Sequence, residues 1–240
     1  RDDFRMYLQP KFILGERHVY GAEALARWKR PDGTILPPAY FMDSLEKIGY
    51  ITELDFYIFE EVLKTLDKWE RQKRRKLVIS TNFSGRHFDT DGEEFLDRIQ
   101  HIFSKYTVPA EYVEIEVTEG VLVKNVHVLE RCVNRLHEIG FRVSIDDFGT
   151  GYSSLSVLAD MPADVVKIDK SFINKDMNGK KMDLLYEIGR MVKILQKDII
   201  IEGVETEEQE KLLINGGFTC GQGYLCNKPI PIGEFEKLYL

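Results

Sequence analysis

The chain has 240 residues, 43% of them hydrophobic, and a formal net charge of −7. This length is typical of one α/β barrel with a single core, and the acidic charge argues against a general binder of DNA, RNA or membrane surfaces. Three cysteines without C-x-x-C spacing indicate neither a disulfide framework nor a zinc knuckle, so we expect reduced thiols and a cytoplasmic location. No apolar run approaches the ~18 residues of a membrane span. We expect residues 1–240 to form one domain of a longer protein, because the sequence starts abruptly at Arg1.

Strand-like and helix-like stretches alternate along the whole chain. Strands are predicted over residues 4–9, 19–28, 77–82, 112–117, 142–146, 165–168, 199–202 and 218–220. Helices are predicted over residues 38–47, 52–71, 93–106, 126–139, 182–196 and 206–215, with a last one from residue 232. This alternation predicts a βα-repeating architecture with a mostly parallel sheet, and eight strands predict a closed barrel.

The stretch V-S-I-D-D-F-G-T-G-Y-S-S, residues 143–154, places two adjacent carboxylates where an apolar strand pattern gives way to a glycine-rich loop. Asp146 and Asp147 end the strand, and their side chains are expected to point in different directions. Two like charges side by side are unfavourable unless a cation holds them. The loop supplies backbone freedom and hydroxyl groups through Gly149, Thr150, Gly151, Ser153 and Ser154. An ordinary acidic turn is the alternative, which the rest of the chain disfavours.

Strand after predicted strand ends in a residue able to bind metal or phosphate, and active sites of α/β barrels are built at such ends. Besides the two aspartates, these residues are Glu23, Arg27, Asn82, Glu116, Glu119, Lys167, Glu202 and Gln222. Carboxylates and an amide, without histidine or thiolate, suit magnesium or manganese rather than zinc. Enough carboxylates converge for two ions, and a pair about 3.5–4 Å apart is the usual arrangement for in-line displacement at phosphorus.

Several of these residues have a chemical role open to them. Lys167 could orient the attacking water or stabilise charge, and Arg27 could clamp a phosphate oxygen. Glu202 could ligate metal or accept a proton. Glu119 could equally be a salt-bridged support. The five histidines form no H-x-H or H-D pair, which disfavours a histidine-ligated phosphodiesterase.

In chain order, the motifs E-A-L, N-x-S, E-V-T-E, D-D-F-G-T-G-Y-S-S-L, V-K-I-D, E-G-V-E-T and Q-G-Y resemble those of the EAL domain family, bacterial enzymes that hydrolyse cyclic di-GMP. The resemblance covers nearly the whole chain and implies a modified TIM barrel with one strand antiparallel to the others. It implies hydrolysis of one phosphodiester bond to linear 5′-pGpG with Mg²⁺ or Mn²⁺, while Ca²⁺ would inhibit. It also implies a homodimer, and an upstream GGDEF or sensor domain that is sometimes accompanied by a membrane anchor.

The resemblance further implies a role for each motif residue. The first metal would be held by Glu23, Asn82, Glu116 and Asp146, and the second by Asp146 and Asp147. Catalysis would involve Lys167, Glu202 and Asp147. Substrate would contact Gln9, Pro10, Leu25, Arg27 and Gln222. The loop support would consist of Glu119, Gly149, Thr150 and Gly151.

Four positions depart from the usual family pattern, namely Ala26, Phe83, Ile201 and Thr219. None of the four removes a ligand. Ile201 and Thr219 could still alter the packing around Glu202 and Gln222, and hence the rate.

Two other functions stay open. Degenerate relatives bind the dinucleotide without cutting it, although they typically lose a metal ligand or the loop, and this sequence keeps both. A different magnesium-dependent barrel enzyme acting on small phosphates would require another order of motifs.

Overall fold

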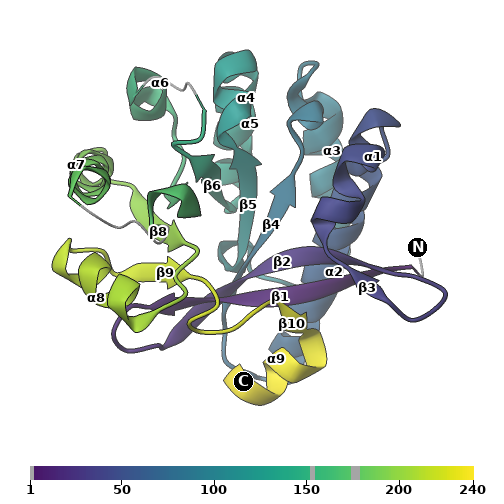
Figure 1. Cartoon of the computed structure of the whole chain (residues 1–240). Coiled ribbons are helices and arrows are strands. Elements are labelled where there is room, and N and C mark those ends of the chain that lie inside the picture. The colour runs from purple at the N-terminus through teal and green to yellow at the C-terminus, as the bar shows by residue number, and fades with distance from the viewer. Residues whose placement is uncertain (1–2, 152–154, 174–178) are drawn as a thin grey trace.

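Eight strands close into a barrel that helices surround (Figure 1). The computed structural model describes residues 3–151, 155–173 and 179–240. Its strands are β1 (Phe4–Ile13), β2 (Val19–Lys29), β3 (Ile35–Leu36), β4 (Val78–Phe83), β5 (Val113–Thr118), β6 (Arg142–Phe148), β7 (Val165–Ile168), β8 (Asp198–Glu202), β9 (Cys220–Gln222) and β10 (Ile230–Pro231). Hydrogen bonding follows the order β1, β9, β8, β7, β6, β5, β4, β2 and returns to β1, while the short strands β10 and β3 add to β1 and β2.

One strand runs against the others. β1 pairs antiparallel with both β2 and β9, whereas the remaining neighbours around the barrel pair in parallel. This confirms the expected modified barrel. β1 reaches Ile13 rather than ending at residue 9, because its ladder with β2 runs from Phe4 opposite Trp28 to Phe12 opposite Val19. Gln9 and Glu23 pair within this ladder, so the expectation that Glu23 lies at a strand end is wrong.

The helices lie outside the barrel (Figure 1). They are α1 (Met42–Lys47), α2 (Ile51–Arg71), α3 (Glu93–Phe103), α4 (Glu119–Lys124), α5 (Val126–Ile139), α6 (Leu155–Asp160), α7 (Lys180–Ile194), α8 (Glu207–Asn215) and α9 (Ile232–Tyr239). The helix predicted over residues 38–47 divides into a 3-10 turn at Pro38–Tyr40 and α1, because Phe41 leaves the helical region at φ −138°. Within the described residues, no helix combines the length and apolar character that a membrane crossing requires.

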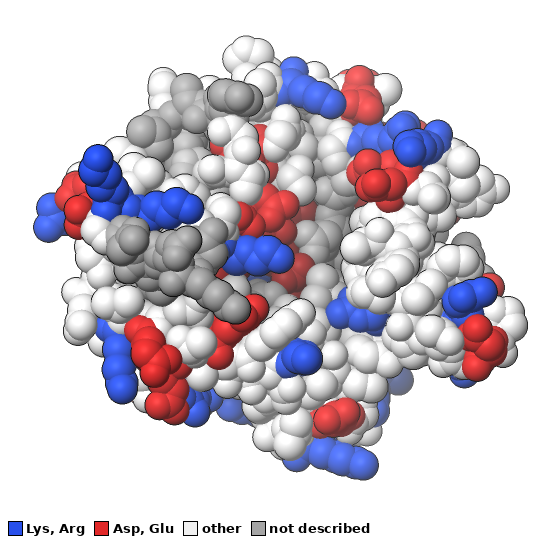
Figure 2. All heavy atoms as spheres, viewed as in Figure 1, with Lys and Arg blue, Asp and Glu red and all other residues white. Residues whose placement is uncertain are grey.

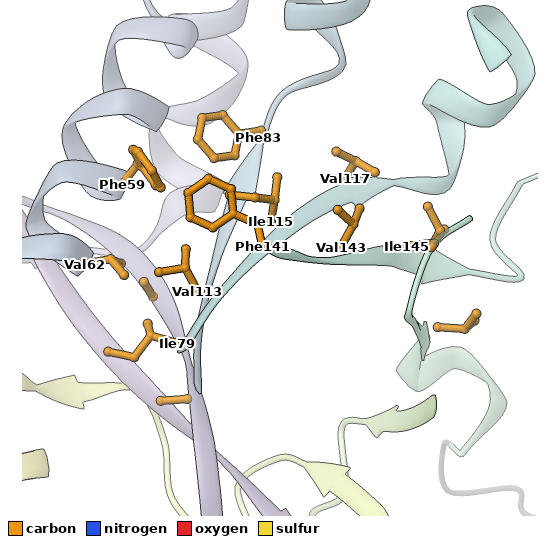
Figure 3. Close-up of a cluster of buried hydrophobic side chains, with 14 of the residues drawn as sticks. Phe59, Val62, Ile79, Phe83, Val113, Ile115, Val117, Phe141, Val143 and Ile145 are labelled. Carbon is orange, nitrogen blue, oxygen red and sulfur yellow. The ribbon is translucent and has the colours of Figure 1, made fainter. Parts of the chain in front are cut away.

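The apolar core fills the space between the barrel and the helices. On β5, Val113 and Ile115 lie near Phe59 of α2 and Phe141, while Val117 lies further along the strand on the same face (Figure 3). All five side chains are almost fully buried. Because side chains alternate along a strand, the intervening Glu114 and Glu116 point into the barrel. The interior of this barrel is therefore available for charged groups.

Candidate functional site

A buried lysine stands at the centre of the barrel mouth. Lys167 on β7 is inaccessible to solvent, and its Nζ lies 2.9 Å from Asp146 Oδ1, 2.9 Å from Glu202 Oε1, 3.0 Å from Glu116 Oε2 and 3.4 Å from Glu23 Oε2. The four carboxylates come from four different strands, β6, β8, β5 and β2. The barrel thus brings together acidic residues that are up to 179 positions apart in the sequence.

Amide side chains fix the carboxylate of Glu23. Asn82 Nδ2 donates to Glu23 Oε1 at 2.6 Å, and Gln222 Nε2 donates to Glu23 Oε2 at 2.5 Å. Gln222 Nε2 also lies 3.2 Å from Gln9 Oε1. Gln222 Oε1 is buried and has no hydrogen-bond partner among the described residues. Because both Glu23 oxygens accept hydrogen bonds, the side chain is held in one orientation.

The two adjacent aspartates face the same site. Ladder pairing between β6 and β7 is irregular between Ile145 and Phe148, and Asp147 adopts a left-handed backbone conformation at φ 55°. This bulge interrupts the alternation of side chains. Asp146 and Asp147 therefore each offer an oxygen within 4.8 Å of the other and of Glu202, although Asp146 is buried and Asp147 is exposed.

Two overlapping sets of carboxylates could each hold a metal ion. Glu23, Glu116 and Asp146 form one, and Asp146, Asp147 and Glu202 form the other, with ligand atoms within 4.8 Å of one another in each set. Opposite ligands about Mg²⁺ are about 4.2 Å apart, twice its bond length of about 2.1 Å. Ligand atoms within 4.8 Å of one another are compatible with binding to one ion, and both sets offer only oxygen. Their chemistry therefore suits a hard divalent cation.

The charges in the site shift one another's protonation. Burial alone would lower the pKa of Lys167, but the surrounding carboxylates outweigh it and hold the pKa well above its usual value. Burial raises the pKa of Glu202 to about 8 and also raises that of Glu23. Burial acts in the same direction on Glu116, but Lys11 and Lys167 outweigh it and lower the pKa of Glu116 to about 2.

Glu119 holds the loop that follows β6. Its Oε2 accepts hydrogen bonds from Gly149 N at 3.0 Å and from Gly151 N at 2.9 Å. Gly149 has φ +96°, and a Cβ at Gly151 would lie 3.1 Å from the Glu119 carboxyl group. Thr150 Oγ1 donates to Asp147 O at 2.9 Å. The hydroxyl groups expected from Ser153 and Ser154 lie outside the described residues.

A cavity of about 280 Å³ opens beside the aspartates and is lined in part by Leu25, Asn82, Asp146 and Asp147. Acidic side chains gather in the hollow at the middle of this face (Figure 2). Arg27 follows Glu23 by four residues on the same face of β2. At about 3.3 Å per residue, it lies about 13 Å further along the strand.

Two substrate residues expected from the sequence lie further from the carboxylates. Arg27 Nη1 donates to Ala26 O, and the guanidinium lies 5.5 Å from the centre of the Tyr7 ring. Pro10 is buried, and strand alternation places it on the opposite face of β1 from Gln9. The structure therefore brings Gln9, but not Pro10, to the carboxylates.

Two of the four departures from the family pattern, Ala26 and Phe83, line the cavity beside the aspartates. Phe83 packs in an aromatic cluster with Phe56 and Phe95, and Ile201 is fully buried next to Gly221 of β9. Ala26 packs against the core, and Thr219 lines a separate cavity below the site.

Sequence reasoning missed two charged residues beneath the site. Lys11 is 1% exposed, and its Nζ lies 2.8 Å from Glu114 Oε1 and 2.9 Å from Glu116 Oε1. The signal was present in the stretch V-E-I-E-V-T, where two glutamates alternate with apolar residues. In a barrel strand whose apolar face packs on helices, such alternation places both glutamates inside the barrel.

The family model for the EAL domain matches residues 1–229. Signaling protein YkoW of Bacillus subtilis is 36% identical over 240 residues, which are 100% of this chain and 30% of that protein. Cyclic di-GMP phosphodiesterase NbdA of Pseudomonas aeruginosa is 31% identical over 237 residues, which are 98% of this chain and 30% of that protein. Among solved structures, the PaMucR phosphodiesterase in complex with c-di-GMP matches with a TM-score of 0.91 and 29% identity, covering 98% of this chain and 95% of that one.

Proposed function

Because the chain belongs to the EAL domain family, we propose that it is a metal-dependent phosphodiesterase that hydrolyses one phosphodiester bond of cyclic di-GMP to linear 5′-pGpG. The relative NbdA is named for this activity, and the matching PaMucR structure contains c-di-GMP. The chain spans only 30% of the relatives YkoW and NbdA. Its placement within a longer cytoplasmic protein, an upstream GGDEF or sensor domain and a homodimeric state stay predictions.

The convergence of Glu23, Glu116, Asp146 and Glu202 on Lys167 carries this proposal. Buried carboxylates repel one another and lose hydration, so such a cluster is unfavourable without a cation. Counting Glu114 and Lys11 as well, the cluster holds five carboxylates and two ammonium groups, a net charge of −3 when all are ionised. Two divalent cations would more than offset this charge.

The oxygen donors fit magnesium or manganese. We propose that the first ion is held by Glu23, Asn82, Glu116 and Asp146, and the second by Asp146 and Asp147, with Glu202 as a further carboxylate of the second set. Asn82 donates to Glu23 through Nδ2, which leaves Oδ1 as its ligand atom. When bound, such ions supply positive charge to the phosphate oxygens and lower the pKa of a coordinated water. Calcium would inhibit, since it takes more ligands at longer distances.

The remaining residues would position the substrate and move protons. Lys167 retains its proton, so its ammonium group would orient the attacking water and stabilise charge that develops on the phosphate. Asp147 would steady the same water. Glu202, whose pKa burial raises to about 8, would exchange a proton at its carboxyl group.

The substrate would extend outward from the carboxylates. Leu25 would line the groove for one half of the dinucleotide, and Arg27 would contact a phosphate further out. Gln9, which faces the site, would lie beside a guanine. Gln222 would hold Glu23 in place while its free Oε1 accepts a hydrogen bond from the substrate.

Incubation of the purified protein with cyclic di-GMP and Mg²⁺ or Mn²⁺ tests the proposal. We expect linear pGpG on chromatography, no product with EDTA, and none from Glu23→Gln. A matched control is Glu187→Gln, which removes an exposed carboxylate of α7 that pairs with Arg190, and should turn over like the parent. Tight binding of cyclic di-GMP without turnover in either metal would reject the enzyme and favour a receptor.

A further inference from the structure

A second layer of charge lies directly beneath the carboxylate cluster. Lys11 sits two residues after Gln9 on β1, and it pairs with Gln222 of β9 and Gly21 of β2 in the barrel ladder. Its ammonium group is buried and donates to Glu114 Oε1 at 2.8 Å and Glu116 Oε1 at 2.9 Å. Lys11 therefore connects the expected metal ligand Glu116 to a carboxylate that is not part of the site.

The two oxygens of Glu116 have different partners. Oε1 accepts from Lys11 at 2.9 Å, and Oε2 accepts from Lys167 at 3.0 Å. Lys167 also contacts Asp146 and Glu23, so Oε2 is the oxygen that faces the other carboxylates. Lys11 engages the oxygen that faces away from them. The carboxylate plane is thus fixed by a donor outside the site.

Glu114, the partner of Lys11 on the side away from the site, lies close to a further charged residue. Glu114 Oε2 lies 3.9 Å from Arg142 Nε, and Arg142 Nη2 lies 2.7 Å from Asp198 Oδ2. Residues of alternating charge therefore extend from the lower end of the barrel to Glu116, in the order Asp198, Arg142, Glu114, Lys11 and Glu116. A cavity of about 270 Å³, lined in part by Lys11, Glu114 and Arg142, adjoins these residues. Without the Lys11 side chain, this space would extend upward to Glu116.

We propose that Lys11 is a positioning residue for the first metal site, in that it holds Glu116 Oε1 and so presents Oε2 to the ion. The inference rests on the metal site of the proposed function. Lys11 makes no contact with the ion or substrate and acts only through Glu116. Its loss frees the Glu116 side chain to turn into the enlarged cavity, away from Glu23 and Asp146. Outer partners of metal ligands typically change metal affinity by about tenfold to a hundredfold.

Three variants separate positioning from a purely structural role. Lys11→Met removes the ammonium group and keeps most of the side-chain volume, but leaves Glu114 and Glu116 buried without their shared cation. Glu114→Gln removes the lower charge and leaves Lys11 on Glu116. The double variant Lys11→Met/Glu114→Gln removes the ammonium group and the Glu114 carboxylate. It therefore leaves no unpaired charge at residue 114, while Glu116 still lacks the hydrogen bond from Lys11.

Each protein is titrated with Mn²⁺ by calorimetry below its melting temperature, and melting is recorded separately. We expect Mn²⁺ to bind Lys11→Met about tenfold to a hundredfold more weakly than the parent. Glu114→Gln should bind as the parent does. The double variant should recover melting temperature relative to Lys11→Met but keep the weak Mn²⁺ affinity, and kcat should fall more than KM rises in both Lys11 variants.

The outcomes distinguish the two proposals. If the double variant regains the parent's Mn²⁺ affinity together with its stability, Lys11 serves only to neutralise Glu114, and the positioning role is overturned. If Lys11→Met binds Mn²⁺ as tightly as the parent, the positioning role is likewise overturned, while the proposed phosphodiesterase activity is unaffected. Failure of the parent itself to bind Mn²⁺ overturns both the metal site and the role of Lys11.

Discussion

Replacing Lys167 with methionine should lower the stability of the metal-free protein and abolish turnover, and Mn²⁺ should restore only the stability. The substitution keeps a long unbranched side chain but removes an ammonium group that lies within 3.4 Å of four carboxylates. Breaking a buried ion pair by removing one partner typically costs about 3–5 kcal/mol. For a protein of this size each kcal/mol lowers the melting temperature by about 2–4 °C. We therefore expect the metal-free variant to melt roughly 6–20 °C below the parent.

Divalent metal should offset much of this loss, because the ion and the ammonium group interact with the same carboxylates. A ligand present at 100 times its dissociation constant stabilises a folded protein by about 2.7 kcal/mol. This corresponds to a rise of about 5–11 °C in melting temperature. The rise should be larger in Lys167→Met than in the parent, since the variant's site carries one more uncompensated negative charge. Turnover should not recover, because the group that would orient water is gone.

The assay is thermal melting in EDTA and in saturating Mn²⁺, with Lys197→Met as the matched control. Lys197 is also a buried lysine, but its Nζ donates to Met161 O at 2.6 Å and Ala163 O at 3.0 Å, away from the carboxylates. Its replacement should lower stability without changing the shift that Mn²⁺ produces. The reasoning fails if Lys167→Met melts like the parent in EDTA, or if Mn²⁺ shifts all three proteins equally.

Three further predictions concern pH, the loop and the substrate. Because burial raises the pKa of Glu202 to about 8, protons compete with metal below that pH, and Mn²⁺ affinity measured by calorimetry should rise by up to about tenfold per pH unit before levelling off near pH 8. Without metal, the stability contributed by neutral Glu202 is fully present below its unfolded value of 4.5 and is lost as pH rises through about 8. Glu119→Ala leaves the N–H groups of Gly149 and Gly151 without a charged acceptor, each bond being worth about 1.5–3 kcal/mol, so thermal melting should show a fall of roughly 6–24 °C and initial rates a lower kcat. Arg27→Ala should raise KM for cyclic di-GMP by about tenfold to a hundredfold with a smaller effect on kcat, and an unchanged KM would remove Arg27 from the substrate site.

The barrel could be predicted from sequence because its strands and helices carry strong local patterns. Seven of the eight barrel strands occur where the apolar runs predicted them, whereas β9 (Cys220–Gln222) shares only residue 220 with the strand predicted over residues 218–220. The strands β3 and β10 have two residues each, and they exist only because β2 and β1 offer a partner. The helices α4 and α6, with six residues each, are likewise too short for a periodic pattern. Such elements depend on tertiary neighbours rather than on their own sequence.

The site was predictable where a motif marks it and not where the barrel alone creates it. The carboxylates of Glu23, Glu116 and Asp146 stand in recognisable motifs, and the structure brings them together. Asp147 reaches the same site because a β-bulge interrupts β6, and the alternation of side chains along a strand does not predict a bulge. Lys11 carries no motif signal, because a charged residue in a strand ordinarily predicts a solvated face.

The interior of this barrel carries charged side chains, whereas the layer between its strands and helices is apolar. Barrels of this kind usually fill their interior with layers of branched apolar side chains. Here Lys11, Glu114, Glu116 and Lys167 occupy that interior, and each is at most 4% exposed. Hydrophobic stabilisation must therefore come chiefly from the layer between strands and helices, where residues such as Ile115 pack (Figure 3). Substitutions in that outer layer should change stability at constant metal affinity, whereas replacing Lys11, Glu116 or Lys167 with a neutral residue should change both.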